Sequence, residues 1–188
     1  MIQIRIHGRG GQGVVAAAEL IATAAFKDGL YAQAFPFFGV ERSGAPIQAY
    51  ARIDRQPIIT REQVYAPDFL VIEDAGLLQA ADTLAGVTKK TIVIVNSPEK
   101  SETIKKIFKI NIKAKQIICI PATDIALHYL GINLVNTSLL GALVKVSKII
   151  SLESLISAIT EKFAGKSAAV INNNIDAAKA AFKYEGSK

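Results

Sequence analysis

The chain has few of the residues that hold metals and clusters. It contains one cysteine, Cys119, and two histidines, His7 and His128, among 188 residues. A single thiol excludes an internal disulfide framework, a four-cysteine zinc site and a cysteine-ligated iron-sulfur cluster built from this chain alone. Neither histidine has a partner histidine or carboxylate at ligand spacing, so we expect structural roles for both and no metal site. Any redox metal chemistry that the protein serves must lie in another chain.

The chain also has no segment that reads as membrane-spanning. The longest uncharged stretch, residues 125–144, contains a histidine, two asparagines, hydroxyl side chains and two glycines, which is typical of a helix end, a loop and a new helix. The amino terminus opens directly into a strand pattern, without the regions of a signal peptide. Because half of the residues are hydrophobic, we expect one compact domain over residues 1–188, located in the cytoplasm and not in a membrane.

The net charge of +6 comes from one stretch of the chain. Residues 89–116 carry eight lysines against two glutamates, and the rest of the chain sums to zero. Isoleucines and a phenylalanine are interleaved with these lysines, a pattern typical of a solvated helix face and of strand ends. This distribution disfavours nucleic-acid binding and leaves an acidic partner protein as a second interpretation.

Period-2 alternation of Ile2, Ile4 and Ile6 with polar residues predicts a first strand. Further strands are expected over residues 31–35, ended by Pro36, and over 47–53, followed by a hairpin turn into 58–60. Short apolar runs over residues 69–72, 91–95 and 116–120 predict fully buried strands.

Helices are expected between these strands and throughout the last third of the chain. The predicted helical ranges are residues 14–27, 101–108, 124–130, 136–149, 151–163 and 168–184. Strands that alternate with helices predict an α/β fold: a mainly parallel twisted sheet with helices on both faces, a Rossmann-like opening unit and a helical C-terminal third.

A glycine-rich loop is the sharpest local motif. It consists of Gly8, Arg9, Gly10, Gly11, Gln12 and Gly13, and it satisfies G-x-G-x-x-G between a strand and a helix. Such glycines allow close backbone approach, and the helix N-terminus offers N–H groups to an anion. A nicotinamide dinucleotide also needs an acidic residue about 20 positions on, where this chain has Ala34, Phe35 and Pro36. Two interpretations stay open: phosphate binding, or tight packing of the helix on the sheet.

Residues 35–46 form the most unusual segment, with sequence FPFFGVERSGAP. It is too apolar for an idle solvated loop and too rich in proline and glycine for a helix. Either Phe37 and Phe38 fold back into the core, or the segment docks on another subunit. In the second case, the interface candidates are Phe37, Phe38, Glu41, Arg42 and Gly44.

Other polar residues carry weaker signals. Cys119 lies in an apolar strand and is expected to be inert packing. Glu73 and Asp74 follow a central strand, at the edge where α/β sheets bind ligands, but we expect Asp74 to cap the next helix. No catalytic triad or paired-carboxylate spacing is present, so we assign no catalytic residue to this chain.

Three blocks together resemble a known family. These are HGRGGQG at residues 7–13, YAQAFPFFGVER at 31–42 followed by GAP at 44–46, and NTSLLGA at 136–142. The chain resembles the gamma subunit of 2-oxoacid:ferredoxin oxidoreductases, most closely the pyruvate type, over essentially its whole length. Ser43 stands where a second arginine is frequent in that family.

The resemblance implies a division of labour among subunits. Such enzymes oxidatively decarboxylate a 2-oxoacid with thiamine diphosphate and magnesium, pass electrons through iron-sulfur clusters to ferredoxin, and transfer the acyl group to coenzyme A. This chain would bind none of the clusters or thiamine, would be inactive alone, and would complete a complex with alpha, beta and delta subunits. The resemblance also implies that the functional surface consists of residues 8–13, the 37–44 segment and Asn136. The alternative is a free-standing nucleotide-binding or regulatory α/β domain, in which a homodimer contact is expected.

Overall fold

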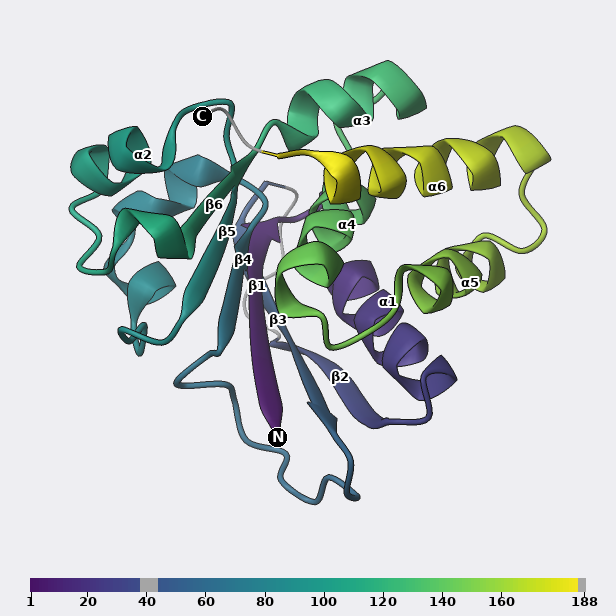
Figure 1. The fold of residues 1–188 in the computed structure, drawn as a ribbon, viewed down its shortest axis with the longest axis horizontal. Coiled ribbons are helices and arrows are strands. Elements are labelled where there is room, and N and C mark those ends of the chain that lie inside the picture. The colour runs from purple at the N-terminus through teal and green to yellow at the C-terminus, as the bar shows by residue number, and fades with distance from the viewer. Residues whose placement is uncertain (38–43, 186–188) are drawn as a thin grey trace.

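The fold is an α/β layer structure built around one six-stranded sheet (Figure 1). A computed structural model describes residues 1–37 and 44–185. The strands are β1 (Ile2–Arg9), β2 (Tyr31–Phe37), β3 (Pro46–Asp54), β4 (Phe69–Ile72), β5 (Ile92–Asn96) and β6 (Ile117–Ile120). The helices are α1 (Val14–Lys27), α2 (Ser101–Ile107), α3 (Ala122–Leu130), α4 (Asn136–Ser147), α5 (Leu152–Lys162) and α6 (Ala168–Lys183).

The strand order is β2-β3-β1-β4-β5-β6, and only β3 runs against the others. The register pairs Ile6 of β1 with Ala49 of β3 on one side and with Val71 of β4 on the other. The predicted mainly parallel sheet and the helical last third are confirmed. The opening strand, loop and helix are also present, but β2 lies at the sheet edge, two strands away from β1, so the usual dinucleotide crevice between neighbouring parallel strands is not formed there.

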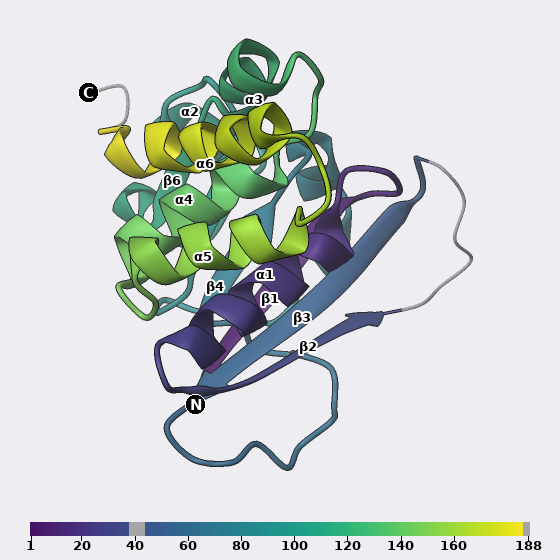
Figure 2. The ribbon, with the colours of Figure 1, turned by 90° about the vertical axis from the view of Figure 1, so that its right-hand side faces the viewer.

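Helices cover the two faces of the sheet unequally (Figure 1), and Figure 2 shows the face covered by α1, α4, α5 and α6. On one face, α1, α4, α5 and α6 pack over β1, β3, β4 and β5 and form the larger apolar core. On the other face, the smaller core joins β4 and β5 to Ile104 of α2 and Leu78. Between β4 and β5 the expected helix is replaced by two short 3-10 turns, η1 (Ala75–Gln79) and η2 (Ala81–Leu84).

The predicted strand over residues 58–60 is wrong. Both edges of β3 are already taken, one by β1 and the other by β2, so the chain after Asp54 finds no free edge on which to form a hairpin. Ile59 is 90% exposed, and the segment crosses the open face of β1 and β3 as an irregular loop. The predicted second strand, residues 31–35, is also two residues short, because this edge strand continues through Pro36 and needs no N–H there.

Two arginines hold that irregular loop in place through its backbone. Arg5 donates from Nη1 to the Val64 carbonyl at 3.1 Å and from Nη2 to the Thr83 carbonyl at 3.1 Å. Arg52, 1% exposed, donates to the Glu62 and Gln63 carbonyls. The guanidinium groups therefore satisfy carbonyl oxygens that the loop cannot pair within a sheet or helix.

The lysine-rich stretch forms a solvated surface, as its pattern predicts. Ile104, Ile110 and Ile112 are buried, whereas every lysine in residues 89–116 except the half-buried Lys105 is exposed. Among residues 1–37 and 44–185, no helix is both long and apolar enough to cross a membrane.

Candidate functional site

The glycine loop, residues 8–13, joins the carboxyl end of β1 to the N-terminus of α1. β1 extends through Arg9, so only residues 10–13 are irregular. Gly11 and Gly13 have φ angles of +97° and +90°, which side-chain-bearing residues rarely adopt. Within the loop, the Gln12 side-chain oxygen accepts a hydrogen bond from the Arg9 N–H at 2.7 Å. The loop is thus closed on itself at the end of the strand.

Two of the glycines are required by close approach of other side chains. A β-carbon at Gly8 would lie 2.5 Å from Val14 Cγ2 and 2.7 Å from Glu73 Oε2. A β-carbon at Gly13 would lie 2.5 Å from Asn136 Nδ2. Gly11 instead has no atom within 4 Å of such a position and is exposed. Packing therefore explains why positions 8 and 13 require glycine. At Gly11 the backbone is instead open to solvent.

Asn136 is the distant residue that the fold brings to this loop. It is the first residue of α4, is 3% exposed and donates from Nδ2 to the Gly13 carbonyl at 3.4 Å. Its Oδ1 accepts from the Thr137 N–H at 2.9 Å. The side chain thus ties the start of α4 to the start of α1.

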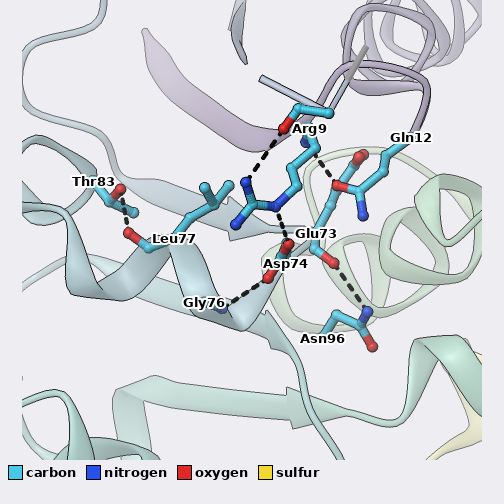
Figure 3. A network of polar contacts seen from close by, with 9 residues as sticks. Arg9, Gln12, Glu73, Asp74, Gly76, Leu77, Thr83 and Asn96 are labelled. Carbon is cyan, nitrogen blue, oxygen red and sulfur yellow. Dashed lines mark hydrogen bonds and ion pairs between the residues drawn. The ribbon is translucent and has the colours of Figure 1, made fainter. Parts of the chain in front are cut away.

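Arg9 connects the loop to the neighbouring strand (Figure 3). Its Nε donates to Asp74 Oδ2, and its Nη1 donates to the Gly44 carbonyl at 3.3 Å. Asp74 Oδ1 accepts from the Gly76 N–H at 2.8 Å and caps the 3-10 turn η1, which confirms the capping prediction for this residue. The Arg9 charge is therefore balanced by a carboxylate within the same site.

The end of the aromatic segment also meets the glycine loop. The Gly10 N–H donates to the Ala45 carbonyl at 2.9 Å, and the Gly44 N–H donates to the Gly10 carbonyl at 3.2 Å. Phe37 is 42% exposed, with its ring 6.4 Å from that of Tyr50, so it does not fold into the core. Phe38, Glu41 and Arg42 lie outside the described residues. Of the five interface candidates, Gly44 thus lies at the loop and Phe37 at the end of β2.

Glu73, one of the weaker candidates in the sequence, is a member of this cluster that we did not include among the predicted site residues. It follows β4, is 1% exposed and lies directly beneath Gly8. Its backbone carbonyl accepts from Asn96 Nδ2 at 2.9 Å, but neither carboxyl oxygen has a hydrogen-bond partner. Burial raises the pKa of Glu73 well above its ordinary value. Its position after a central strand was the available signal, although nothing in the sequence indicated that it would be enclosed.

The other polar candidates, His7 and Cys119, are not suited to a chemical role. Burial, aided by the charge of Arg5, lowers the pKa of His7 to about 3, so this buried ring is neutral. Burial raises the pKa of the Cys119 thiol to about 11, which leaves it a poor nucleophile. Cys119 is half-buried rather than enclosed, because β6 is the edge strand of the sheet. Among the described residues, no three histidine, cysteine, aspartate or glutamate side chains gather as metal ligands.

A family profile described as pyruvate ferredoxin/flavodoxin oxidoreductase matches residues 3–184. The chain belongs to this family. It is 48% identical over 183 residues to the pyruvate/ketoisovalerate oxidoreductases common subunit gamma of Thermococcus kodakarensis, covering 97% of this chain and 96% of that one. It is 47% identical over 185 residues to the pyruvate synthase subunit PorC of Methanothermobacter marburgensis, covering 97% of each.

A solved structure gives the same result. The crystal structure of pyruvate oxidoreductase subunit PORC from Thermotoga maritima is 37% identical to this chain, with a TM-score of 0.84, over 96% of this chain and 94% of that one. The family resemblance of the sequence motifs is thereby confirmed, and with it the role of an oxidoreductase subunit.

Proposed function

We propose that this chain is the gamma subunit of a pyruvate:ferredoxin oxidoreductase, an enzyme that oxidatively decarboxylates a 2-oxoacid to an acyl-CoA and passes electrons to ferredoxin. The observation that carries the proposal is similarity over nearly the full length of chains named as gamma subunits of such enzymes. The first of these is named as common to pyruvate and ketoisovalerate oxidoreductases. We therefore propose that other subunits select the 2-oxoacid, and that this chain is a component that enzymes with different 2-oxoacid substrates can share.

The residues of this chain do not fit the cofactors of such a complex. One cysteine cannot hold an iron-sulfur cluster, and the chain has no Gly-Asp-Gly ahead of an Asn-Asn pair of the kind that holds thiamine diphosphate with magnesium. We assign these groups to alpha, beta and delta partners, and we place the complex in the cytoplasm. The lone chain then has no 2-oxoacid oxidation activity.

The functional surface we propose is the glycine loop with Asn136 and the 37–44 segment. Gly11 leaves backbone exposed at the N-terminus of α1, a 14-residue helix whose amide dipoles favour a negative group. Since Asp74 balances Arg9, attraction of an anion falls mainly to the backbone N–H groups. We propose that the phosphate-bearing end of coenzyme A approaches this loop and that the 37–44 segment docks on the thiamine-binding subunits.

Native purification tests the subunit role. The tagged chain is recovered from its own cells, copurifying proteins are identified by mass spectrometry, and the fraction is assayed for ferredoxin reduction dependent on both pyruvate and coenzyme A. We expect an iron-sulfur subunit, thiamine-dependent subunits and that activity. A lone chain that binds an adenine nucleotide stoichiometrically would instead support the free-standing nucleotide-binding alternative.

The docking role of the 37–44 segment is tested in the same way with Phe38→Ala and Arg42→Ala. Loss of the partner subunits from either variant supports docking. Full recovery of the complex with both variants would remove this part of the proposal.

A further inference from the structure

Glu73 is an enclosed acid at the base of the glycine loop. β4 delivers it to the edge of the sheet beside Gly8, and Figure 3 shows its side chain pointing toward that of Gln12. The absence of a side chain at Gly8 makes the room that the Glu73 carboxyl occupies, because a β-carbon there would lie 2.7 Å from Oε2. The loop and the acid therefore share one space.

Within the described part of the chain, neither a counter-charge nor a hydrogen-bond donor is paired with the Glu73 carboxyl group. Both carboxyl oxygens are buried without a partner. The side-chain oxygen Oε1 of Gln12, which is 3.1 Å from the same β-carbon position, already accepts a hydrogen bond from the Arg9 backbone N–H. An ionised carboxylate enclosed in this way would lose its hydration with no compensating hydrogen bond. A protonated carboxyl has an O–H with which to donate.

The groups around Glu73 leave the ionised form without stabilisation. The charged side chains beside it, Arg9 at the end of β1 and Asp74, pair with each other. His7 of β1 is neutral and belongs to the opposite face of the sheet. The polar side chains contributed by β5, α3 and α4 are the uncharged Asn96, Thr123 and Asn136. Burial is accordingly the sole cause of the raised pKa of Glu73.

We infer that Glu73 is a neutral carboxylic acid that positions the glycine loop, and that its ionisation weakens anion binding at that loop. The inference rests on the proposed function, because the anion in question is the phosphate-bearing end of coenzyme A. A negative charge beneath the backbone N–H groups that face the ligand would repel a phosphate across a medium of low dielectric. The neutral acid supports the loop without this repulsion, so anion binding weakens as the pH rises through the pKa of Glu73, which burial raises.

The test measures binding of desulfo-coenzyme A, which cannot react, to the intact complex over a pH series. The wild-type complex is compared with Glu73→Gln, which is neutral and nearly isosteric, and with Glu153→Gln, an exposed control on α5. We expect Glu73→Gln and wild type to bind equally at low pH. The wild-type affinity should then fall relative to Glu73→Gln by up to about tenfold for each pH unit above the Glu73 pKa of the ligand-free complex, and should level off above the higher Glu73 pKa of the ligand-bound complex. The Glu153→Gln complex should follow wild type.

Coincident pH profiles for wild type and Glu73→Gln, or much weaker binding by Glu73→Gln at neutral pH, would overturn the inference. An infrared difference spectrum between wild type and Glu73→Gln gives a readout independent of the ligand. A carbonyl band of a protonated carboxylic acid at neutral pH, missing from Glu73→Gln, is expected, and its absence would contradict the neutral acid. If instead Gly13→Ala and Asn136→Ala both leave binding unchanged, the proposed ligand role of the loop fails, and the infrared result still decides the state of Glu73.

Discussion

Gly13 and Asn136 are 123 positions apart in the chain, yet the Asn136 side chain occupies the space where a β-carbon of Gly13 would be. The N-terminus of α1 and the N-terminus of α4 are thereby fixed side by side at one edge of the sheet. Two blocks that stand out separately in the sequence, the glycine loop and the buried NTSLLGA segment, are thus in direct contact. The predictions below start from this contact.

Gly13→Ala should destabilise the protein more than Gly11→Ala. Both positions have positive φ, so an alanine at either one costs about 1–2 kcal/mol of backbone strain. Only at Gly13 does the new methyl group also meet Asn136, at 2.5 Å, which should add about 1–3 kcal/mol. Chemical denaturation of the two variants compares them directly, and equal losses would show that Asn136 moves aside without cost.

Gly141→Ala should be among the most damaging single substitutions. Gly141 of α4 faces α6, where a β-carbon would lie 2.0 Å from the Ala178 carbonyl oxygen, and neither backbone can yield easily. We expect a loss of about 3 kcal/mol or more. Gly165→Ala is the matched control, since its β-carbon position is open and only its φ of +88° opposes alanine. Similar melting temperatures for the two variants would contradict the close helix contact.

Arg5→Lys should loosen the loop that crosses the open sheet face. Arg5 bonds backbone carbonyls on both the 64–65 and 83–85 segments, which a single ammonium group cannot reach together. We expect a loss of about 2–3 kcal/mol and faster proteolysis within residues 55–66. Arg55→Lys, on the exposed part of the loop, should change neither quantity. Protection from proteolysis that survives Arg5→Lys would show that other contacts hold the loop.

Stability should fall in acid through His7. Its pKa is lowered from 6.5 to about 3 in the folded protein, so below pH 6.5 the unfolded chain binds a proton that the folded chain does not. The contribution of neutral His7 to the free energy of unfolding is fully present above pH 6.5. As the pH falls from 6.5 to about 3, this contribution declines by about 1.4 kcal/mol per pH unit. The neutral variant His7→Gln should lack this part of the acid sensitivity. Identical pH dependence of unfolding in the two proteins would show that His7 is solvated.

Much of the fold could be predicted because its signals are local. Alternation at Ile2, Ile4 and Ile6, and the short apolar runs of β4, β5 and β6, follow from which faces are buried. The strand expected over residues 58–60 failed because its formation depends on a free edge of β3, which is set by the pairing of strands distant in sequence. A local pattern carries no information about that edge.

The site was predictable in part for the same reason. The glycine loop is one continuous motif, and Asn136 lies in a block that the family resemblance singles out. Glu73 owes its neutral state to the fold: Gly8, Val14 and Gln12 close over it, and no cation reaches it. Arg9 likewise reads as a free cation in the sequence and is paired with Asp74 in the structure.

The Michaelis constants of the purified complex test the central claim, that the glycine loop and Asn136 receive coenzyme A. Steady-state ferredoxin reduction by wild type and by the Asn136→Ala complex gives KM for coenzyme A and for pyruvate in the same preparation, so partial loss of stability changes the amount of active enzyme and not the ratio of the two constants. The account predicts that KM for coenzyme A rises about tenfold, equivalent to about 1.4 kcal/mol, because the glycine loop loses the hydrogen bond that holds it to α4, while KM for pyruvate stays unchanged. Two unchanged constants, or equal increases in both, would contradict it.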